Sequence, residues 1–563
     1  MAPITDDEWA DLVTHELPKA SDPVIQRYLE SRRALMAEEQ KHRSDFSFRQ
    51  ALSPIAKKAC EIVSKIRDDE RKPGASPPPA RQPATLKSWS IVRRMPKGAL
   101  LRAHCCSLAD IDHLVETALR TPGLCISCPS GHLATAAARE EAGLCIRYRG
   151  GADPDLGDRP PWTPDYKPGT FVPLTQAADS YPQGGKEGFV GWLKERCGGM
   201  SGPSSSGSDL MGGMLFYEPI WRAFFQRLMA NLVEDGLAWL ELRLTFPLVY
   251  YREGSEEPEP DYDHMFQAVE EEVATFRAGG PGFGRFWGLR VIWSTSMRNR
   301  DSRAIIESAD DCIAAKLVWP QLVAGYDLAD SERLGGRPLA DLLPELFWFR
   351  KQCAVENVQI PFLLRTGGGS SGDRARDATG EDDVVDALLL GARRIGHATS
   401  LHRHPRLVEA VRDRRILVEG CPVFYNDTRL DPAADVAMHD GLRVLLAQGV
   451  PCALCDDDSG ILPPPGKERE AGSRMTDLFW QVLDAWDEAD LATLGSLAEN
   501  SVRWAALEDQ DPETWAQDIR AASVGAGVKA ARLQQWAVDW ERFCLWVVTE
   551  YGGDDGEDAN VAG

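Results

Sequence analysis

Residues 288–329, GLRVIWSTSMRNRDSRAIIESADDCIAAKLVWPQLVAGYDLA, contain one strand–helix–strand unit. The apolar runs at 288–295 and 322–329 have the length and the continuous apolarity of strands that are covered on both faces. The residues between them, 303–317, carry apolar side chains at helical spacing. A strand, a helix and a second strand in this order are typical of parallel α/β sheets.

The same alternation recurs along most of the chain. Eight short apolar runs occur, at residues 99–104, 237–246, 288–295, 322–329, 360–367, 393–399, 415–422 and 451–458. Helical patterns separate most of them, and eight strand–helix repeats are typical of a closed (β/α)8 TIM barrel. The alternative is an open doubly wound sheet, but no glycine-rich phosphate-binding turn follows the first run. The sequence therefore predicts an α/β barrel.

The remaining segments predict a barrel with additions. Helical spacing predicts an N-terminal helical region, a proline-rich stretch predicts a linker, and over a hundred residues separate the first two runs. We expect the helical region at 1–70, the linker at 71–90, the barrel at 91–120 and 216–470, an inserted subdomain with a mobile loop at 121–215, C-terminal helices at 471–548 and an acidic disordered tail at 549–563. Flexible glycine- and serine-rich stretches are expected at 198–214 and 366–383.

Bulk composition excludes some partners. The 563 residues carry a formal net charge of -23, which disfavours binding to nucleic acids or to anionic membranes. The first twenty residues are acidic and lack the apolar core of a signal peptide, and no apolar stretch is long enough to span a bilayer. We therefore expect a cytoplasmic protein whose 13 cysteines are reduced.

Polar side chains stand at the ends of several predicted strands. The first run ends in LLRAHCCSLAD (100–110), which places Arg102 and His104 there, and later runs end at Arg365, at His397 and at the aspartates 456–458. Reacting groups of barrel enzymes lie at the carboxyl ends of the strands. Histidines together with a final aspartate at these ends suggest a metal-dependent hydrolase, and ordinary core or surface residues are the alternative of about equal weight.

Five ordered motifs give this pattern a family resemblance. They are MPKGALLRAH (95–104), VAGYDLADSE (323–332), RIGHATSLHRHP (394–405), EGCPVFYN (419–426) and ALCDDDSG (453–460). The chain resembles the adenosine deaminase family of the amidohydrolase superfamily, over residues 91 to about 465. It is most similar to the adenosine deaminase-related growth factor branch, which has the Met-Pro-Lys-Gly start and an inserted domain. The resemblance implies a barrel that deaminates purine nucleosides with one zinc ion.

The resemblance also implies where the family's functional groups fall. The family's zinc ligands are two first-strand histidines, a fifth-strand histidine and an eighth-strand aspartate, and these positions hold Arg102, His104, Arg365 and Asp457. The family's proton-transfer glutamate falls at Gly368. The water-orienting histidine is retained as His397, the aspartate that contacts the purine ring as Asp458, and a purine-contacting glycine falls at Asp330. Two of four zinc ligands and the proton-transfer group are thus replaced.

The replacements lead to a charge-substitution hypothesis. Arginine is permanently protonated and has no lone pair for a metal, so Arg102 and Arg365 oppose zinc binding. We expect their guanidinium groups to replace the charge of the dication and to pair with Asp457 and neighbouring carboxylates. Zinc-dependent deamination is then weak or absent. The pocket keeps His397, Asp457 and Asp458 as candidate catalytic groups. Asp458, Asp330, Arg102 and Arg365 are the candidate contacts to a purine nucleoside or an anionic molecule.

Other hypotheses remain open. Strand alternation places His104 with Cys106 and Cys455 with Asp457, which together could form a rebuilt zinc site in an active deaminase or hydrolase. Metal-free catalysis on an anionic substrate, with His397 as the base, is a further possibility. In a third hypothesis the chain is an interaction or assembly protein that uses the N-terminal helices and the insert. The resemblance implies that these helices form a partner or homodimer surface, and the alternative is that they pack against the outside of the barrel. Cys125, Cys128 and His132 are expected to be loop and core residues rather than a zinc knuckle.

Overall fold

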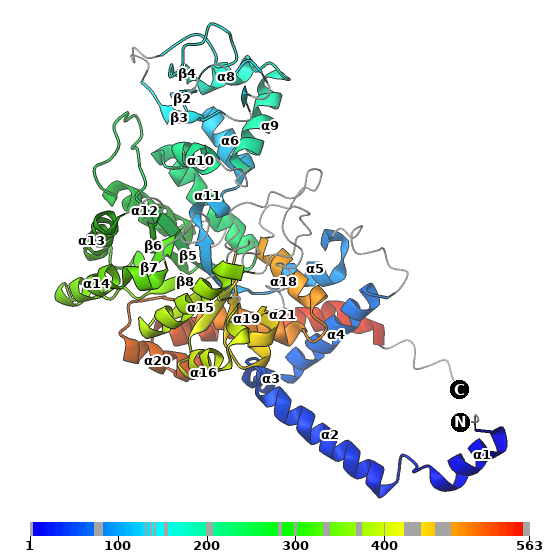
Figure 1. The fold of residues 1–563 in the computed structure, drawn as a ribbon. Coiled ribbons are helices and arrows are strands. Elements are labelled where there is room, and N and C mark those ends of the chain that lie inside the picture. Colours follow the sequence, from blue (N-terminus) through cyan, green and yellow to red (C-terminus); the bar gives the residue numbers. More distant parts are fainter. Residues whose placement is uncertain are drawn as a thin grey trace.

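The computed structural model describes residues 4–555 except 73–82, 130, 132, 136–137, 140–141, 151–155, 199–205, 280–283, 298–300, 330–337, 367–373, 399, 422–440 and 457–473. Figure 1 shows a central barrel with helices on its outside, a smaller unit at the top, and an N-terminal arm that extends away from the body.

Eight parallel strands form the barrel, and all eight predicted runs are strands. They are β1 (Gly98–His104), β5 (Leu237–Phe246), β6 (Gly288–Ser296), β7 (Val323–Ala329), β8 (Leu363–Thr366), β9 (Arg394–His397), β10 (Leu417–Gly420) and β11 (Cys452–Leu454). They pair in the orders β1-β5-β6-β7 and β8-β9-β10-β11. The continuous burial of strands such as β7 explains why their sequences are apolar rather than alternating.

The two four-stranded sheets meet at both seams. Between β7 and β8, the amide of Tyr326 donates to the carbonyl of Pro361 at 2.9 Å, and Tyr326 forms a bridge with Phe362. Between β11 and β1, the amide of Asp456 donates to the carbonyl of Arg102 at 3.2 Å. The strands therefore follow one another around a single (β/α)8 barrel, which confirms the predicted fold class. We call the face at the carboxyl ends of the strands the mouth, and the opposite face the floor.

Helices between consecutive strands cover the outside of the barrel. They are α11 (Glu218–Glu234), α12 (Asp263–Gly279), α13 (Ser302–Val318), α14 (Leu343–Val355), α15 (Arg374–Leu389) and α16 (Pro405–Asp413). The range of α15 corrects one expectation, because residues 374–383 were expected to belong to a flexible stretch. Their helix leads into the buried residues Val384, Ala387 and Leu388, whose packing fixes the end of α15 against the barrel.

The chain between β1 and α11 forms the unit at the top of Figure 1. It contains α6 (Ile111–Arg120), β2 (Leu124–Ser127), β3 (Cys145–Tyr148), β4 (Val172–Pro173), α8 (Leu174–Asp179), α9 (Gly185–Gly198) and α10 (Ser206–Leu215), and its strands pair in the order β3-β2-β4. A mobile loop was expected over 198–214, but most of its second half is helix α10. Leu210, Met211 and Met214 are buried there, so packing outweighs the glycine- and serine-rich composition.

The N-terminal region is helical, as its spacing predicts. It contains α1 (Asp6–Asp11), a π-helical turn (Leu12–Glu16), α2 (Pro23–Lys41), α3 (Phe46–Ala51), α4 (Pro54–Glu70) and α5 (Lys87–Arg94). The predicted linker at 71–90 is too long at its end, because α5 begins at Lys87 and buries Trp89. The proline-rich residues 73–82 lie outside the described part of the chain.

The C-terminal region consists of α18 (Arg474–Ala485), α19 (Leu491–Arg503), α20 (Pro512–Ala521) and α21 (Val528–Tyr551). Helix α21 packs against α4 and α19, which joins the two ends of the chain (Figure 1). It extends three residues beyond the predicted boundary at 548, and the expected acidic tail lies outside the described residues from 556 onward. Among the helices that the structure describes, none combines the length and the apolar composition needed to cross a bilayer.

Candidate functional site

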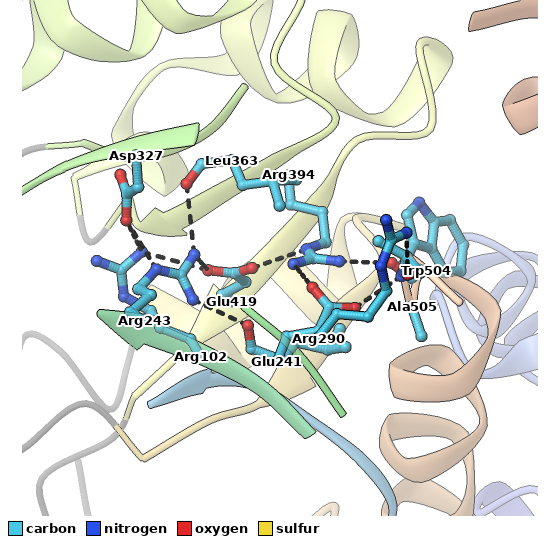
Figure 2. A network of polar contacts seen from close by, with 12 residues as sticks. Arg102, Glu241, Arg243, Arg290, Asp327, Leu363, Arg394, Glu419, Trp504 and Ala505 are labelled. Carbon is cyan, nitrogen blue, oxygen red and sulfur yellow. Dashed lines mark hydrogen bonds and ion pairs between the residues drawn. The ribbon is translucent and has the colours of Figure 1, made fainter. Parts of the chain in front are cut away.

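Six charged side chains meet inside the barrel, and each is fully buried. They come from five strands and comprise three guanidinium groups and three carboxylates: Arg102, Arg243, Arg394, Glu241, Asp327 and Glu419 (Figure 2). A charge buried away from water is costly unless it is paired. The equal numbers of fixed cations and carboxylates make this set, which we call the central network, electrically balanced.

Arg102 and Arg243 share two carboxylates on the mouth side of the network. Arg243 donates through Nε to Asp327 Oδ2 at 2.7 Å and through Nη2 to Glu419 Oε2 at 3.0 Å. Arg102 Nη1 lies 3.3 Å from the same Oε2 of Glu419 and 3.6 Å from Oδ2 of Asp327. Without Arg102, the central network would hold two guanidinium groups against three carboxylates. Arg102 therefore supplies the cation that balances it.

Arg394 connects the network to the floor. Its Nε donates to Glu419 Oε1 at 2.8 Å, and its Nη2 donates to Glu241. Glu419 thus contacts all three guanidinium groups and is the centre of the network (Figure 2). Glu241 also accepts a hydrogen bond from the amide of Ala506 at 2.6 Å.

Gly396 on β9 provides the space for Arg102. A Cβ atom on Gly396 would lie 2.2 Å from Nη1 of Arg102 and 2.8 Å from its Cζ. No larger residue fits there while Arg102 keeps its place. The glycine of the Arg-Ile-Gly-His motif is therefore a steric requirement of the buried guanidinium group.

The arginines keep the buried acids ionised. Burial by itself would raise the pKa of Glu419, but Arg243, Arg394 and Arg102 outweigh that effect and lower it below its usual value. The pKa of Asp327 is lowered in the same way, because Arg243 and Arg102 outweigh its burial. Both carboxylates are therefore charged at neutral pH, and the three arginines compensate these charges.

The predicted strand-end residues lie around the mouth above this network. His104 ends β1, where it is half-buried and in register with Arg243. Arg365 is half-buried on β8, in register with Gly396, and its amide donates to Asp327 Oδ1 at 3.0 Å. His397 ends β9 with φ at +64°, in the left-handed region that side chains with a Cβ rarely adopt.

Arg102 was expected to contact a ligand or Asp457, and Asp457 lies outside the described residues, so that contact stays a prediction. The guanidinium group of Arg102 lies inside the barrel and is completely inaccessible to solvent, and its described carboxylate partners are Asp327 and Glu419. Asp330, Gly368, Asp457 and Asp458 lie outside the described residues. The neighbouring Asp456 binds Arg474 of α18, whose Nη2 donates to its Oδ1 at 3.2 Å.

The proposed zinc site of His104, Cys106, Cys455 and Asp457 includes a residue outside the described part of the chain, Asp457, so it stays a prediction. Strand β1 ends at His104, and Cys106 lies in the following 3-10 turn (Cys105–Leu108), so strand alternation does not apply to it. Cys455 is buried. Over the described ranges, no three His, Cys, Asp or Glu side chains form a group that could hold a metal ion. Cys125 and Cys128 are buried core residues, as expected, and His132 is not among the described residues.

Sequence reasoning missed five members of the central network: Glu241, Arg243, Asp327, Arg394 and Glu419. Each lies within one of the eight predicted apolar runs, where strands covered on both faces should carry no charge. A charged residue in such a run must find a partner of opposite sign. Applied to all eight runs, this rule would have predicted that their charged residues pair with one another inside the barrel.

Comparisons with known proteins identify the family. The family model described as Adenosine deaminase matches residues 222–522, more than half of the chain. An adenosine deaminase of Phlebotomus duboscqi is 25% identical over 82% of this chain and 79% of its own length. Adenosine deaminase 2 of Sus scrofa is 26% identical over 81% and 80%.

Solved structures of deaminases and amidohydrolases also match at low identity. An amidohydrolase of Burkholderia ambifaria, solved with bound zinc, has a TM-score of 0.48 at 14% identity and covers 82% of this chain and 95% of that one. An adenine deaminase of Arthrobacter aurescens has a TM-score of 0.41 at 14% identity and covers 76% and 100%. On the extent of the family-model match, this chain belongs to the adenosine deaminase family.

Proposed function

We propose that this chain is a member of the adenosine deaminase family that has lost zinc-dependent adenosine deamination. The observation that carries the proposal is Arg102, a buried guanidinium group paired with Glu419 and Asp327 where the resemblance places a zinc ligand. A permanent cation at this position cannot donate an electron pair to zinc and repels a dication. Arg365 at the second replaced ligand position adds to the repulsion.

The replacement preserves the charge balance of the barrel. The three buried carboxylates of the central network need three cations, and Arg102 supplies the third without a metal. The half-buried His104, Arg365 and His397 remain at the mouth. We propose that this mouth binds a small purine nucleoside or anionic molecule, with Arg365 as the charged contact and His397 available as a base.

Metal content and turnover test the loss of activity. The purified full chain, incubated with zinc and desalted, should retain far less than one zinc per chain and should release no inosine from adenosine. Sus scrofa adenosine deaminase 2, treated in parallel, serves as the positive control. Stoichiometric zinc together with inosine release at a rate comparable to that of the control would refute the proposal. It would favour an active site completed by residues such as Asp457.

We further propose that the chain forms a homodimer through its N-terminal helices. None of the residues of α1 and α2 is buried, and both helices expose large apolar side chains. These are Trp9, Val24, Tyr28 and Leu35, and together with Val13 of the π-helical turn they are 43% to 74% exposed. Figure 1 shows this arm extending away from the rest of the chain. Exposed apolar side chains on a projecting helix favour association with another copy.

Removal of residues 1–41 should convert the dimer to a monomer. The deletion leaves α3 anchored, because Arg49 still binds Asp45 and, at 2.7 Å, Asp490. The free energy of unfolding of the monomeric unit should therefore change little. Sedimentation velocity of the full chain and of the deletion variant measures both masses. A full chain that is already monomeric, or a deletion variant that stays dimeric, would contradict the proposal.

A further inference from the structure

A short segment between α19 and α20 lies at the barrel floor, next to helix α19, which contacts β1 and β11. Four charged side chains hold the backbone of Trp504–Ala506. Arg394 Nη1 donates to the carbonyl of Trp504 at 2.8 Å, and Lys529 Nζ donates to that of Ala505 at 2.8 Å. The amide of Ala506 donates to Glu241 Oε1 at 2.6 Å. The carbonyl of Ala506 accepts from Arg290 Nη1 at 3.1 Å. We call these three residues the floor segment (Figure 2).

Lys529 differs from the other charged groups of the floor. It lies in the first turn of the long C-terminal helix α21, is almost completely buried, and its Nζ lies 4.2 Å above the ring of Trp515 on α20. The central network is already balanced by three guanidinium groups and three carboxylates. A charge on Lys529 would add a buried cation close to Arg394 and Arg393, which Glu241, Asp518 and the ring of Trp515 offset only in part. An uncharged amine can still donate its hydrogen bond to Ala505.

We propose that Lys529 is a protonation-controlled latch, whose uncharged amine closes the floor segment and whose charged form loosens it. The segment is continuous with the central network, because Glu241 binds both Ala506 and Arg394, and Arg394 binds Glu419. Opening of the floor exposes Lys529 to water and relieves the cost of its buried charge. The latch thus connects the protonation of one lysine to the closure of the barrel below the candidate site.

The surroundings of Lys529 set the pH range of the latch. Burial lowers the pKa of Lys529 from 10.5 to about 7, Glu241 and Asp518 act in the opposite direction, and Arg394 and Arg393 lower it further. When the floor opens, the amine regains water and its ordinary pKa. Between about pH 7 and pH 10 the open form thus holds one more proton than the closed form. Closure should therefore strengthen as the pH rises through this window and stay constant below it.

Hydrogen exchange of the full chain measures this opening. Peptides that cover residues 504–510 are followed at pH 7, 8 and 9, and the rates are corrected for intrinsic exchange at each pH. In the natural protein the opening constant should fall about tenfold for each pH unit, as the loss of one proton requires. Lys529→Met carries no titrating charge and also loses the hydrogen bond to Ala505, so its opening constant should show no slope with pH.

Two further variants make the result specific. Lys529→Arg is permanently charged, so its floor segment should open readily at every pH with no slope. Lys97→Met removes a different buried lysine, whose pKa is about 8 and which lies at the start of β1, and should leave the slope at 504–510 unchanged. A natural protein with no slope, or Lys529→Met with the slope of the natural protein, would overturn the proposal.

Discussion

Replacement of Arg102 by methionine is expected to lower the free energy of unfolding by about 3–5 kcal/mol, the usual cost of breaking a buried ion pair. Methionine fills much of the same volume but removes the guanidinium group that pairs with Glu419 and Asp327. The network would then hold two guanidinium groups against three buried carboxylates. Urea denaturation at neutral pH measures the loss. The deficit should shrink at acid pH, where the under-compensated carboxylates of the variant take up protons.

A matched exposed pair controls for the loss of an arginine. Arg303 and Glu307 form a 2.7 Å ion pair between one turn and the next on the surface of α13, and both side chains are more than half exposed. Arg303→Met should change the free energy of unfolding by less than about 1 kcal/mol. If Arg102→Met and Arg303→Met lowered the free energy of unfolding by equally small amounts, Arg102 would not balance buried charge. Introducing Gly396→Ala, which crowds the guanidinium group, should cost less in the Arg102→Met background than alone.

Glu419→Gln should be at least as destabilising, at the upper end of about 3–5 kcal/mol. Glutamine has nearly the same shape, so the change isolates the charge. Glu419 accepts from Arg102, Arg243 and Arg394, and a glutamine amide would turn an NH2 group toward one of these guanidinium groups. The central network would then hold three buried cations against two carboxylates.

The control for this substitution is Glu307→Gln in the same exposed pair, with an expected effect below about 1 kcal/mol. Chemical denaturation of both variants gives the comparison. A Glu419→Gln variant as stable as the natural protein would contradict the central network. In that case Glu419 would already be protonated, and its arginines would find other partners.

The barrel could be predicted from sequence because its signal is local. The run predicted at 288–295 is strand Gly288–Ser296, and the run at 322–329 differs from Val323–Ala329 by one residue. Each run is apolar because both faces of its strand are covered. Helices cover the outer face, and side chains in the barrel interior cover the inner face. Helix α10 could not be predicted in this way. Its glycines and serines favour a loop, and only its buried contacts with the rest of the unit make it helical.

The candidate site was predictable only in part. Sequence placed Arg102, His104, Arg365 and His397 at strand ends, and the structure finds them on β1, β8 and β9. The carboxylate partners of Arg102 are on strands that follow it by more than two hundred residues, and no spacing rule connects such positions. Only closure of the barrel brings β7 and β10 next to the side chain of β1. The balance of buried charge follows from that closure.

The most direct measurement is a crystal structure of the full chain, grown with zinc and recorded at the zinc absorption edge. We predict that the Arg102 guanidinium group lies within hydrogen-bonding distance of Glu419 and close to Asp327, and that no anomalous peak lies beside His104. A strong peak coordinated by His104 and Asp457, with Arg102 turned out of the barrel, would contradict the account.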